Sequence, residues 1–428
     1  MRVLVVSAEP VGERMAGPAI RAYELARALA DACDVTLSAP APSTVADPRL
    51  RLVEAGMPDV ERLVAAARGH DIVVAQELPP VVLARLGSVR LVADLYNALV
   101  IEMLEGGASR RTQRRIAART LALCAAADLV LCANERQRDL LIGGMALHGL
   151  LDPETYARDP SLRSLVAIVG FGLPDEPAPQ PTGALRRAFP EIGERVLLWG
   201  GGVWDWLDPE TPLRALERLD PDVHLLMLGL GRPGLEASGQ GAAVGRFVEL
   251  AAGNPRVHVN TGWVPYAERG QWLAEADVAV SAHRDHLEAR YAHRTRLLDA
   301  LWAGLPVVTT RGDALAELIE RERLGATVAP GDVDGYAEAC ARLLGPDGNA
   351  ARERVARIVP ALRWSVLAAP LVEWCTNPPP RRRVRRDVVR RATLAQYRWA
   401  LAETLGEQGP AAAARRVGRR LRRAVRLR

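Results

Sequence analysis

Short apolar runs alternate with amphipathic segments along most of this chain, and this alternation limits the possible folds more than any other feature. The run RVLVVSA precedes the helix-like segment PAIRAYELARALADA, and the runs DVTLSAP, HDIVVAQ, VRLVADLY and DLVLCAN follow with helical patterns between them. Regular alternation of strands and helices predicts a parallel sheet with helices on both faces. The chain is therefore expected to be an α/β protein.

A second series of the same kind begins after residues 170–182, GFGLPDEPAPQPT, which we interpret as a domain linker. Its strand-like runs are RVLLWGGG, VHLLMLGLG, RVHVNTGW, ADVAVSAH, PVVTT and ATVAPG. A length of 428 residues also suits two domains better than one core. We predict doubly wound, Rossmann-like domains over residues 1–180 and 181–377, with a ligand cleft between them at the carboxyl ends of their strands.

Cysteine content and hydropathy indicate the compartment. The five cysteines are an odd number with no CxxC pair, and no apolar run approaches the roughly 18–20 residues that cross a bilayer. The first residues, MRVLVVSAEP, are typical of a first strand rather than of a signal peptide. We expect a cytoplasmic protein with reduced thiols. Every basic residue is arginine, which excludes Schiff-base lysines and the P-loop lysine.

The end of the chain differs from the body in charge. Residues 381–428 contain 16 arginines and three acids, a net charge of +13, whereas the remainder has 40 basic and 48 acidic residues, a net charge of −8. Two helical patches, roughly 388–406 and 411–427, carry the arginines. We predict a basic helical tail over residues 378–428 that makes the protein peripheral on an anionic membrane surface. A solvated, partly disordered end is the alternative, and the acidic body disfavours nucleic-acid binding.

Residues 291–308, YAHRTRLLDALWAGLPVV, predict an anion site on a helix. Thr295 can cap this helix, and a Gly-Leu-Pro sequence ends it before the strand VVTT. A helix start offers unpaired N–H groups and the positive end of its dipole, which suit phosphate. We expect a diphosphate at the helix tip beside Arg294 and Arg296, and ribose or sugar hydroxyls at Asp299. A capped amphipathic helix without a ligand is the alternative.

Two glycine clusters follow strand-like runs of the second series. Gly200, Gly201 and Gly202 end the run VLLW, and Gly229 begins GLGRPG, which has the GxGxxG spacing. No clear helix follows that motif, so nicotinamide or flavin binding is disfavoured. We expect both loops to let the backbone approach a ligand that lies over the strand ends, and a purely structural turn is the alternative for the second loop.

Aromatic and histidine side chains near these loops carry weaker signals. Trp204 and Trp206 follow the triple glycine and can stack on a base or a sugar, although at least one of them is expected to pack in the core. The spacing of His283, His286 and His293 fits no compact metal motif. We predict that no metal binds.

Residues 200–345 resemble glycosyltransferase family 4, the retaining GT-B enzymes that use nucleotide-activated sugars. LLDALWAGLPVVTTRGDALAEL is similar to that family's signature LLEAMACGxPVVASxxGGxxEL, and GWVPYAERGQWLAEADVAVSA to its segment GxVxxxxLxxxYxxADVxVxPS. The N-terminal MAGPAIRAYELARALADACDVTLSA resembles its glycine loop, first helix and second strand. The likeness covers most of residues 1–375. It implies the GT-B fold, with the donor bound mainly by the C-terminal domain and the acceptor by the N-terminal one.

The resemblance also assigns the donor site to particular residues. Asp299 takes the place of the glutamate that holds the donor ribose, and the backbone around Arg294 and Thr295 takes that of the diphosphate-binding turn. Trp263 and Val264 fall where the base is contacted. The implied donor-binding residues are Gly17, Gly200, Gly201, Gly202, Trp204, Gly229, Trp263, Val264, Arg294, Thr295, Arg296 and Asp299.

The sequence departs from the family at charged positions. Tyr291 stands where the first glutamate of the E-x7-E pair is usual, and Gly202 and Leu207 replace the usual phosphate-binding arginine and lysine. The negative charges of a donor diphosphate must still be balanced, and this chain has only arginine to balance them. The candidates are Arg294 and Arg296, followed by Arg284 and Arg290.

The N-terminal half also lacks a family residue, the histidine near the end of an N-domain strand. Asp94, in VADLYNAL, is closest to that place. We predict that it is catalytic together with Arg294 and orients the acceptor hydroxyl or the donor sugar; a cap on the following helix is the alternative. Tyr96 and Glu102 are the acceptor-side candidates.

Taken together, the resemblance implies transfer of a sugar, of hexosyl type, from a nucleotide-diphosphate donor to an acceptor hydroxyl with retention. The leaving diphosphate helps to deprotonate the incoming hydroxyl, so no protein nucleophile, metal or cofactor is required. The protein positions the substrates and stabilises the charge on the departing group. A lipid-linked or polysaccharide acceptor, in the synthesis of envelope polysaccharide, glycolipid or a glycosylated metabolite, would suit the basic tail. The alternatives are a non-catalytic binding partner of GT-B shape and a nucleotide-sugar epimerase.

Overall fold

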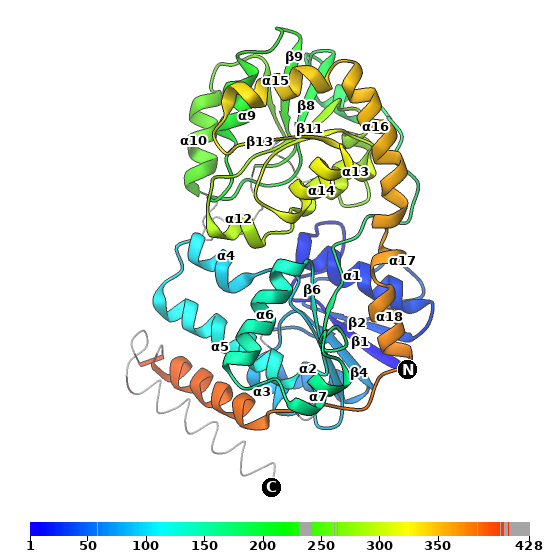
Figure 1. Cartoon of the computed structure of the whole chain (residues 1–428), viewed down its shortest axis with the longest axis vertical. Helices are drawn as coiled ribbons and strands as arrows, with labels where there is room; N and C mark the ends of the chain where they lie inside the picture. The colour runs from blue at the N-terminus through cyan, green and yellow to red at the C-terminus, as the bar shows by residue number, and fades with distance from the viewer. Residues whose placement is uncertain are drawn as a thin grey trace.

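The protein folds into two α/β domains, one above the other in Figure 1. The computed structural model describes residues 1–410 apart from 58, 231–240, 261, 263, 383, 403 and 406–409. Each domain has one parallel sheet with helices on both faces, as the alternating sequence pattern predicts.

The N-terminal domain is built on a seven-stranded parallel sheet. Its strand order is β3 (Arg51–Glu54), β2 (Asp34–Ala39), β1 (Arg2–Val6), β4 (Ile72–Ala75), β5 (Arg90–Asp94), β6 (Leu129–Cys132) and β7 (Val166–Ile168). Its helices are α1 (Gly17–Ala30), α2 (Val60–Arg68), α3 (Pro80–Leu83), α4 (Leu99–Glu105), α5 (Arg110–Ala126), α6 (Glu135–Leu147) and α7 (Pro153–Arg158). The inner strands β4 and β6 are buried at every position because helices cover both faces. The two edge strands, β3 and β7, are absent from the sequence prediction, and both are only partly buried.

The C-terminal domain contains a six-stranded parallel sheet, and each of its strands lies in one of the predicted apolar runs. The strand order is β10 (Val257–Val259), β9 (Val223–Met227), β8 (Arg195–Trp199), β11 (Val278–Ser281), β12 (Val307–Thr310) and β13 (Gly325–Val328). Its helices are α8 (Ala184–Ala188), α9 (Glu210–Leu216), α10 (Gly241–Ala251), α11 (Arg269–Leu273), α12 (Leu287–Tyr291), α13 (Thr295–Trp302), α14 (Ala314–Glu322), α15 (Val333–Leu343) and α16 (Pro346–Ile358).

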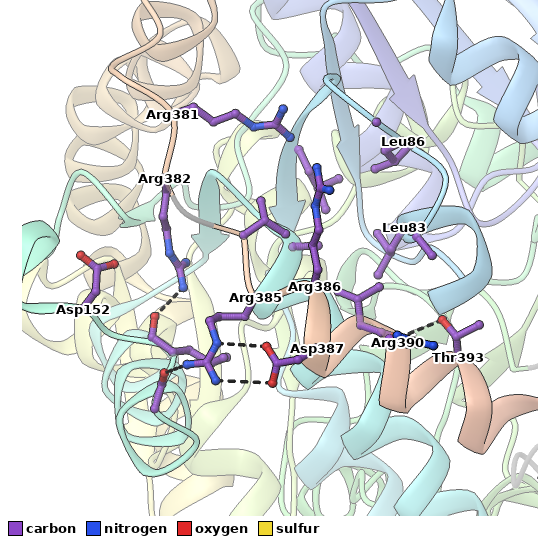
Figure 2. A pocket seen from close by; sticks show the side chains of 18 of the residues that line it. Leu83, Leu86, Asp152, Arg381, Arg382, Arg385, Arg386, Asp387, Arg390 and Thr393 are labelled. Atoms are coloured by element: carbon purple, nitrogen blue, oxygen red, sulfur yellow. Dashed lines mark hydrogen bonds and ion pairs between the residues drawn. The ribbon is translucent and has the colours of Figure 1, made fainter.

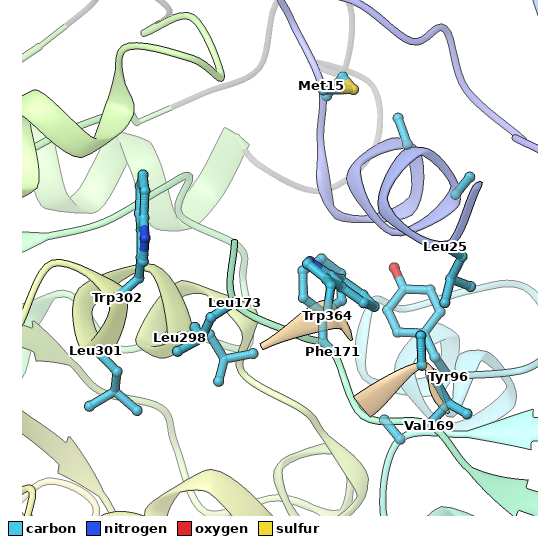
Figure 3. Packing of buried hydrophobic residues seen from close by; sticks show 14 of the residues in the cluster. Met15, Leu25, Tyr96, Val169, Phe171, Leu173, Leu298, Leu301, Trp302 and Trp364 are labelled. Carbon is cyan, nitrogen blue, oxygen red and sulfur yellow. The ribbon is translucent and has the colours of Figure 1, made fainter. Parts of the chain in front are cut away.

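After α16 the chain returns to the N-terminal domain. A 3₁₀ turn, η1 (Val359–Leu362), leads to α17 (Trp364–Leu367) and α18 (Ala369–Thr376), and both helices contact α1. The aromatic rings of Tyr96, Phe171 and Trp364 pack in a row, with 6.0 and 5.0 Å between successive ring centroids (Figure 3). A Cβ atom at Gly172 would lie 2.6 Å from the Trp364 ring, so only glycine allows this approach. The predicted C-terminal domain, which ends at residue 377, therefore includes two helices, α17 and α18, that pack against the N-terminal domain.

The first part of the basic tail also packs on the N-terminal domain. Residues 386–402 are helical, and Val388, Val389 and Ala392 are buried in a hydrophobic cluster of that domain. Arg382 is buried and donates to the carbonyl oxygen of Leu150. The tail and the domain enclose a cavity of about 1300 Å³ at the amino ends of β5 and β6 (Figure 2). The apolar side of the first helical patch completes a core of the N-terminal domain, and its predicted role as a membrane-surface anchor stays a prediction. The patch at 411–427 lies outside the described residues.

No helix among the described residues is both long and apolar enough to cross a membrane.

Candidate active site

A cavity of about 260 Å³ lies between the two domains at the carboxyl ends of their central strands. Residues 15–17 at the start of α1 form its N-terminal wall, and strand-end loops with the start of α13 form the opposite wall. It brings together these predicted donor-binding residues: Gly17, Gly200, Gly201, Gly202, Trp204, Gly229, Val264, Thr295, Arg296 and Asp299. The predicted Trp263 and the later glycines of the GxGxxG motif lie outside the described residues.

Two helices begin at this cavity without a side-chain cap. α1 starts at Gly17 after Ala16, and no side chain accepts from its first turn. α13 starts at Thr295, and its N-cap residue is Arg294, which also makes no capping hydrogen bond. The prediction that Thr295 caps the helix is therefore wrong, since Thr295 is already its first residue. The uncapped N–H groups and the positive dipole ends make both helix starts suitable for an anion.

Arg296 lines this cavity together with Arg269. The Arg296 guanidinium lies over the Trp199 ring, 5.2 Å from the centroid, and its Nη1 is buried without a hydrogen-bond partner. It forms no ion pair with any carboxylate of the described part of the chain. Burial, followed by the neighbouring charge of Arg294, lowers the pKa of Arg296. Since an unpaired buried charge is costly, this arrangement calls for a bound anion.

Arg294 differs from its neighbour because an acid neutralises it. Its Nη2 lies 2.7 Å from Oε2 of Glu288, its Nη1 lies 3.3 Å from Oε1, and both side chains are buried. Oδ2 of Asp313 lies 3.9 Å from Nε of Arg294. Arg294 does not line the cavity, and neither do the exposed Arg284 and Arg290. Sequence reasoning missed Glu288, which lies one helical turn before Tyr291 and supplies an acid near the position where the family's first glutamate is absent.

Asp299 lines the cavity and is already paired. Its Oδ1 accepts from Nε of Arg269 at 3.1 Å, and about a third of the Asp299 side chain is exposed. The Arg269 guanidinium stacks on the rings of Tyr266 and Trp302, 3.7 and 5.0 Å from their centroids. Tyr266 in turn donates to Glu24 of α1 at 3.0 Å. Arg269 was not predicted, because nothing in its local sequence marks it as a partner of a residue 30 positions away.

Asp94 is held in the interior of the N-terminal domain. Both of its carboxylate oxygens accept from Arg21 of α1 at 2.7 to 3.0 Å, and both side chains are almost completely buried. The other N–H groups of Arg21 donate to the carbonyl oxygens of Val169 and Gly170. Asp94 does not cap α4 either, since the start of that helix has no side-chain cap. The structure thus contradicts the capping role, and it shows that the carboxylate of Asp94 neutralises Arg21; the catalytic role stays a prediction.

The two acceptor-side candidates lie on the N-terminal side of the cleft. The buried Tyr96 ring packs against Arg21, 4.7 Å away, and its hydroxyl lies near Gly17. Glu102 accepts from Nδ2 of Asn97 at 3.2 Å. Burial and the charge of the Glu288 carboxylate raise the pKa of Glu102 to about 7. Figure 1 shows α4 of the N-terminal domain below α12 of the C-terminal domain, and these two helices contact each other.

Of the remaining candidates, the two tryptophans, His283 and His286 have structural partners, whereas both ring nitrogens of His293 are buried without a hydrogen-bond partner. The Trp204 and Trp206 rings stack with 5.4 Å between centroids, and Trp204 lines the cavity. His286 accepts from the first turn of α12, and His283 lies 3.5 Å from Asp313. Burial lowers the pKa of His293 to about 4, so this imidazole is neutral at physiological pH. Among the described residues, no group of three or more His, Cys, Asp or Glu side chains could hold a metal ion.

Comparison with known proteins gives the same architecture. Residues 194–345 match the family model described as Glycosyl transferases group 1. HepE from Anabaena, solved with UDP-glucose, is similar over 88% of this chain and 99% of its own, with a TM-score of 0.64 and 16% identity. No curated protein matches the chain in sequence.

Two further solved structures have the same fold. Sucrose-phosphate synthase from Thermosynechococcus elongatus covers 87% of this chain and 97% of its own, with a TM-score of 0.62 and 16% identity. WaaG, a glycosyltransferase involved in lipopolysaccharide biosynthesis, is similar over 88% of this chain and 100% of its own, with a TM-score of 0.58 and 16% identity. The predicted GT-B fold and the resemblance to its glycosyltransferases are confirmed.

Proposed function

We propose that this chain, a GT-B protein with a glycosyl transferases group 1 domain, moves a hexosyl group from a nucleoside-diphosphate donor to an acceptor hydroxyl with retention. The observation that carries the proposal is the buried, unpaired guanidinium of Arg296 in a cavity where two uncapped helices begin. HepE was solved with UDP-glucose, and we propose a UDP-sugar for this chain also.

The donor diphosphate is proposed to lie against the starts of α1 and α13, where the helix dipoles and Arg296 balance its charge. Gly200, Gly201 and Gly202 present only backbone to it, which allows close approach. Asp299 would exchange its contact with Arg269 for the ribose hydroxyls. The Trp204 ring, which lines the same cavity, offers a flat surface to the base or sugar.

The chemistry proposed for this site is a front-face substitution. The acceptor hydroxyl attacks the anomeric carbon from the side on which the diphosphate leaves, and a diphosphate oxygen takes up the hydroxyl proton. Arg296 and the two helix starts stabilise the negative charge that develops on the departing diphosphate. Closure of the domains on the donor would hold both substrates in line. The proposed reaction requires no metal.

Release of nucleoside diphosphate from a panel of UDP-, GDP- and TDP-hexoses, in the presence of a cell-envelope extract as acceptor, tests this proposal. We expect release from a UDP-hexose, unchanged by EDTA, and a product with the anomeric configuration of the donor by NMR. An inverted product would contradict retention. Donor binding without turnover would favour the non-catalytic alternative, and epimerised donor without transfer would favour the epimerase.

The place of the reaction is proposed to be the inner surface of a membrane, in the synthesis of envelope polysaccharide, glycolipid or a glycosylated metabolite. The helix at 386–402 has exposed arginines at 386, 390, 391 and 398, and α5 has others at 110, 111 and 114. The side chain of Arg111 donates to the carbonyl oxygen of Trp399, which joins the two helices. Each such charge near an anionic leaflet contributes about 1 kcal/mol.

Cosedimentation with vesicles tests this location. We expect the full chain to bind vesicles rich in anionic phospholipid and not neutral phosphatidylcholine vesicles, and to be released from the anionic vesicles by high salt. Reversal of exposed charges in Arg110→Glu, Arg114→Glu, Arg390→Glu and Arg398→Glu together should abolish binding without loss of donor turnover. Comparison of the full chain with a variant truncated after residue 410 measures how much the last 18 residues contribute to vesicle binding. If the charge-reversed variant binds anionic vesicles as well as the wild type does, the arginines of α5 and of the helix at 386–402 do not form the membrane-binding surface.

A further inference from the structure

An apolar cavity of about 350 Å³ lies in the N-terminal domain and is not used by the donor. The loop from β5 to α4 forms one wall, and α5 and α6 form the others. The apolar side chains that line it include Leu99, Val100, Ile116, Leu140, Leu141 and Met145. The cavity is partly open to solvent, because Ala117 and Gly144 in its lining are exposed, and apolar recesses of this size are typical of ligand sites.

Three amide side chains line one end of this cavity, and Glu9, Glu77, Arg119, Thr120 and His148 also contribute to its lining. Gln76 and Asn97 lie just after β4 and β5, and Gln137 lies at the start of α6. Gln76 donates to the carbonyl oxygen of Pro18 at 2.9 Å, and Gln137 donates to that of Tyr291 in the C-terminal domain at 2.8 Å. The carboxyl edge of the sheet, which faces the interdomain cleft, thus supplies amide groups to the cavity, whereas leucine, isoleucine and methionine side chains of α5 and α6 supply apolar lining.

The first turn of α1 separates this cavity from the donor cavity. Gly17 lines the donor cavity, whereas the next residue, Pro18, lines the apolar one. Tyr96 also lines the apolar cavity, and its hydroxyl would lie only 3.5 Å from a Cβ atom at Gly17. A molecule with its apolar part between α5 and α6 would thus have its polar end within one helical turn of the donor.

We propose that this cavity holds the apolar portion of an amphipathic acceptor, an alcohol or sugar carried on an apolar chain. The acceptor hydroxyl lies at the amide-lined end, near Asn97 and Gln137, and reaches the donor past Gly17. This inference rests on the proposed sugar transfer and adds the class of acceptor. A free, fully hydrated sugar would leave the space between α5 and α6 without apolar contacts.

Two adjacent glycines of α6 provide a matched pair of variants. Gly144 lines the cavity and Gly143 does not. A Cβ atom added at either position meets no atom within 4 Å, so both positions accept a larger side chain without a backbone shift. Gly144→Trp should fill the cavity, and Gly143→Trp should not. Ala117→Trp, from the α5 wall, fills the same space from the other side.

The probes are n-alkyl β-glucosides from methyl to octyl, used below their micelle-forming concentrations, with affinities measured by ligand-observed NMR. We expect the affinity of the wild type and of Gly143→Trp to rise by about fourfold for each methylene that becomes buried. Octyl glucoside should bind at least about tenfold more weakly to Gly144→Trp and to Ala117→Trp. UDP affinity should be the same in all four proteins.

Affinity that does not depend on chain length, or equal octyl glucoside binding by the two glycine variants, would overturn the inference. The UDP measurement separates it from the proposed function. If the wild type binds no UDP but its affinity for alkyl glucosides still rises with chain length, the apolar site is supported and the proposed sugar transfer is refuted. If UDP binds and chain length has no effect, only the acceptor class fails. Should Gly144→Trp not fold, the wild-type series and Ala117→Trp decide the question.

Discussion

Replacing Arg296 with methionine is expected to weaken binding of UDP by about 100-fold, which corresponds to about 2.8 kcal/mol. The expectation follows from the position of this guanidinium, which is enclosed in the interdomain cavity and has no carboxylate partner in the described part of the chain. In such a low-dielectric site a charge-assisted hydrogen bond to phosphate is stronger than it is in water. Isothermal titration calorimetry with UDP measures the change directly.

The same variant should be more stable than the wild type in the absence of ligand. Methionine fills a similar volume and removes an unpaired buried charge, so the free energy of unfolding in urea is expected to rise by about 1–3 kcal/mol. Arg294→Met is the matched control, because it leaves Glu288 buried without its cation and should lower stability. Loss of both affinity and stability in Arg296→Met would mean that this residue is structural.

Replacing Asp94 with leucine is expected to lower the free energy of unfolding by about 3–5 kcal/mol, because Arg21 would remain in the core without a counter-charge. Urea denaturation of the full chain, followed by circular dichroism, measures the loss of stability. The effect should be larger than that of any exposed ion pair in the protein, since exposed pairs contribute about 1 kcal/mol or less.

The double variant Arg21→Met, Asp94→Leu serves as the control. Two apolar side chains replace the ion pair, so most of the lost stability should return. The carbonyl oxygens of Val169 and Gly170 would lose their donors, which limits the recovery. A variant Asp94→Leu with native stability and no sugar transfer would instead support a catalytic role for this carboxylate.

The sheets of both domains could be predicted from local sequence because inner parallel strands are buried on both faces. Runs such as IVVA in β4 and VVTT in β12 therefore have an apolar or small side chain at every position. The edge strand β3 has no fully buried residue, and its sequence RLVE does not differ from a loop. The cleft glycines were also predictable, because they follow buried strands at the edge where ligands bind.

The charges of the site could not be predicted in the same way. Whether an arginine is free or paired depends on carboxylates that are distant in sequence, as with Arg21 and Asp94, 73 positions apart. The sequence shows Arg294 and Arg296 as equals, two residues apart at one helix start. Only the fold shows that Glu288 neutralises the first and that no acid of the described residues forms an ion pair with the second. A motif specifies which residues come near a ligand, but long-range packing sets their protonation and partners.

The return of the chain to its first domain determines the order in which the protein can be assembled during translation. Val388, Val389 and Ala392 belong to the same buried cluster as Leu83, so the N-terminal domain still lacks side chains that are synthesised only after the C-terminal domain. Until then, its surface near α3 exposes apolar groups to solvent. A nascent chain that stops before residue 381 is expected to be a chaperone substrate, although both sheets are complete.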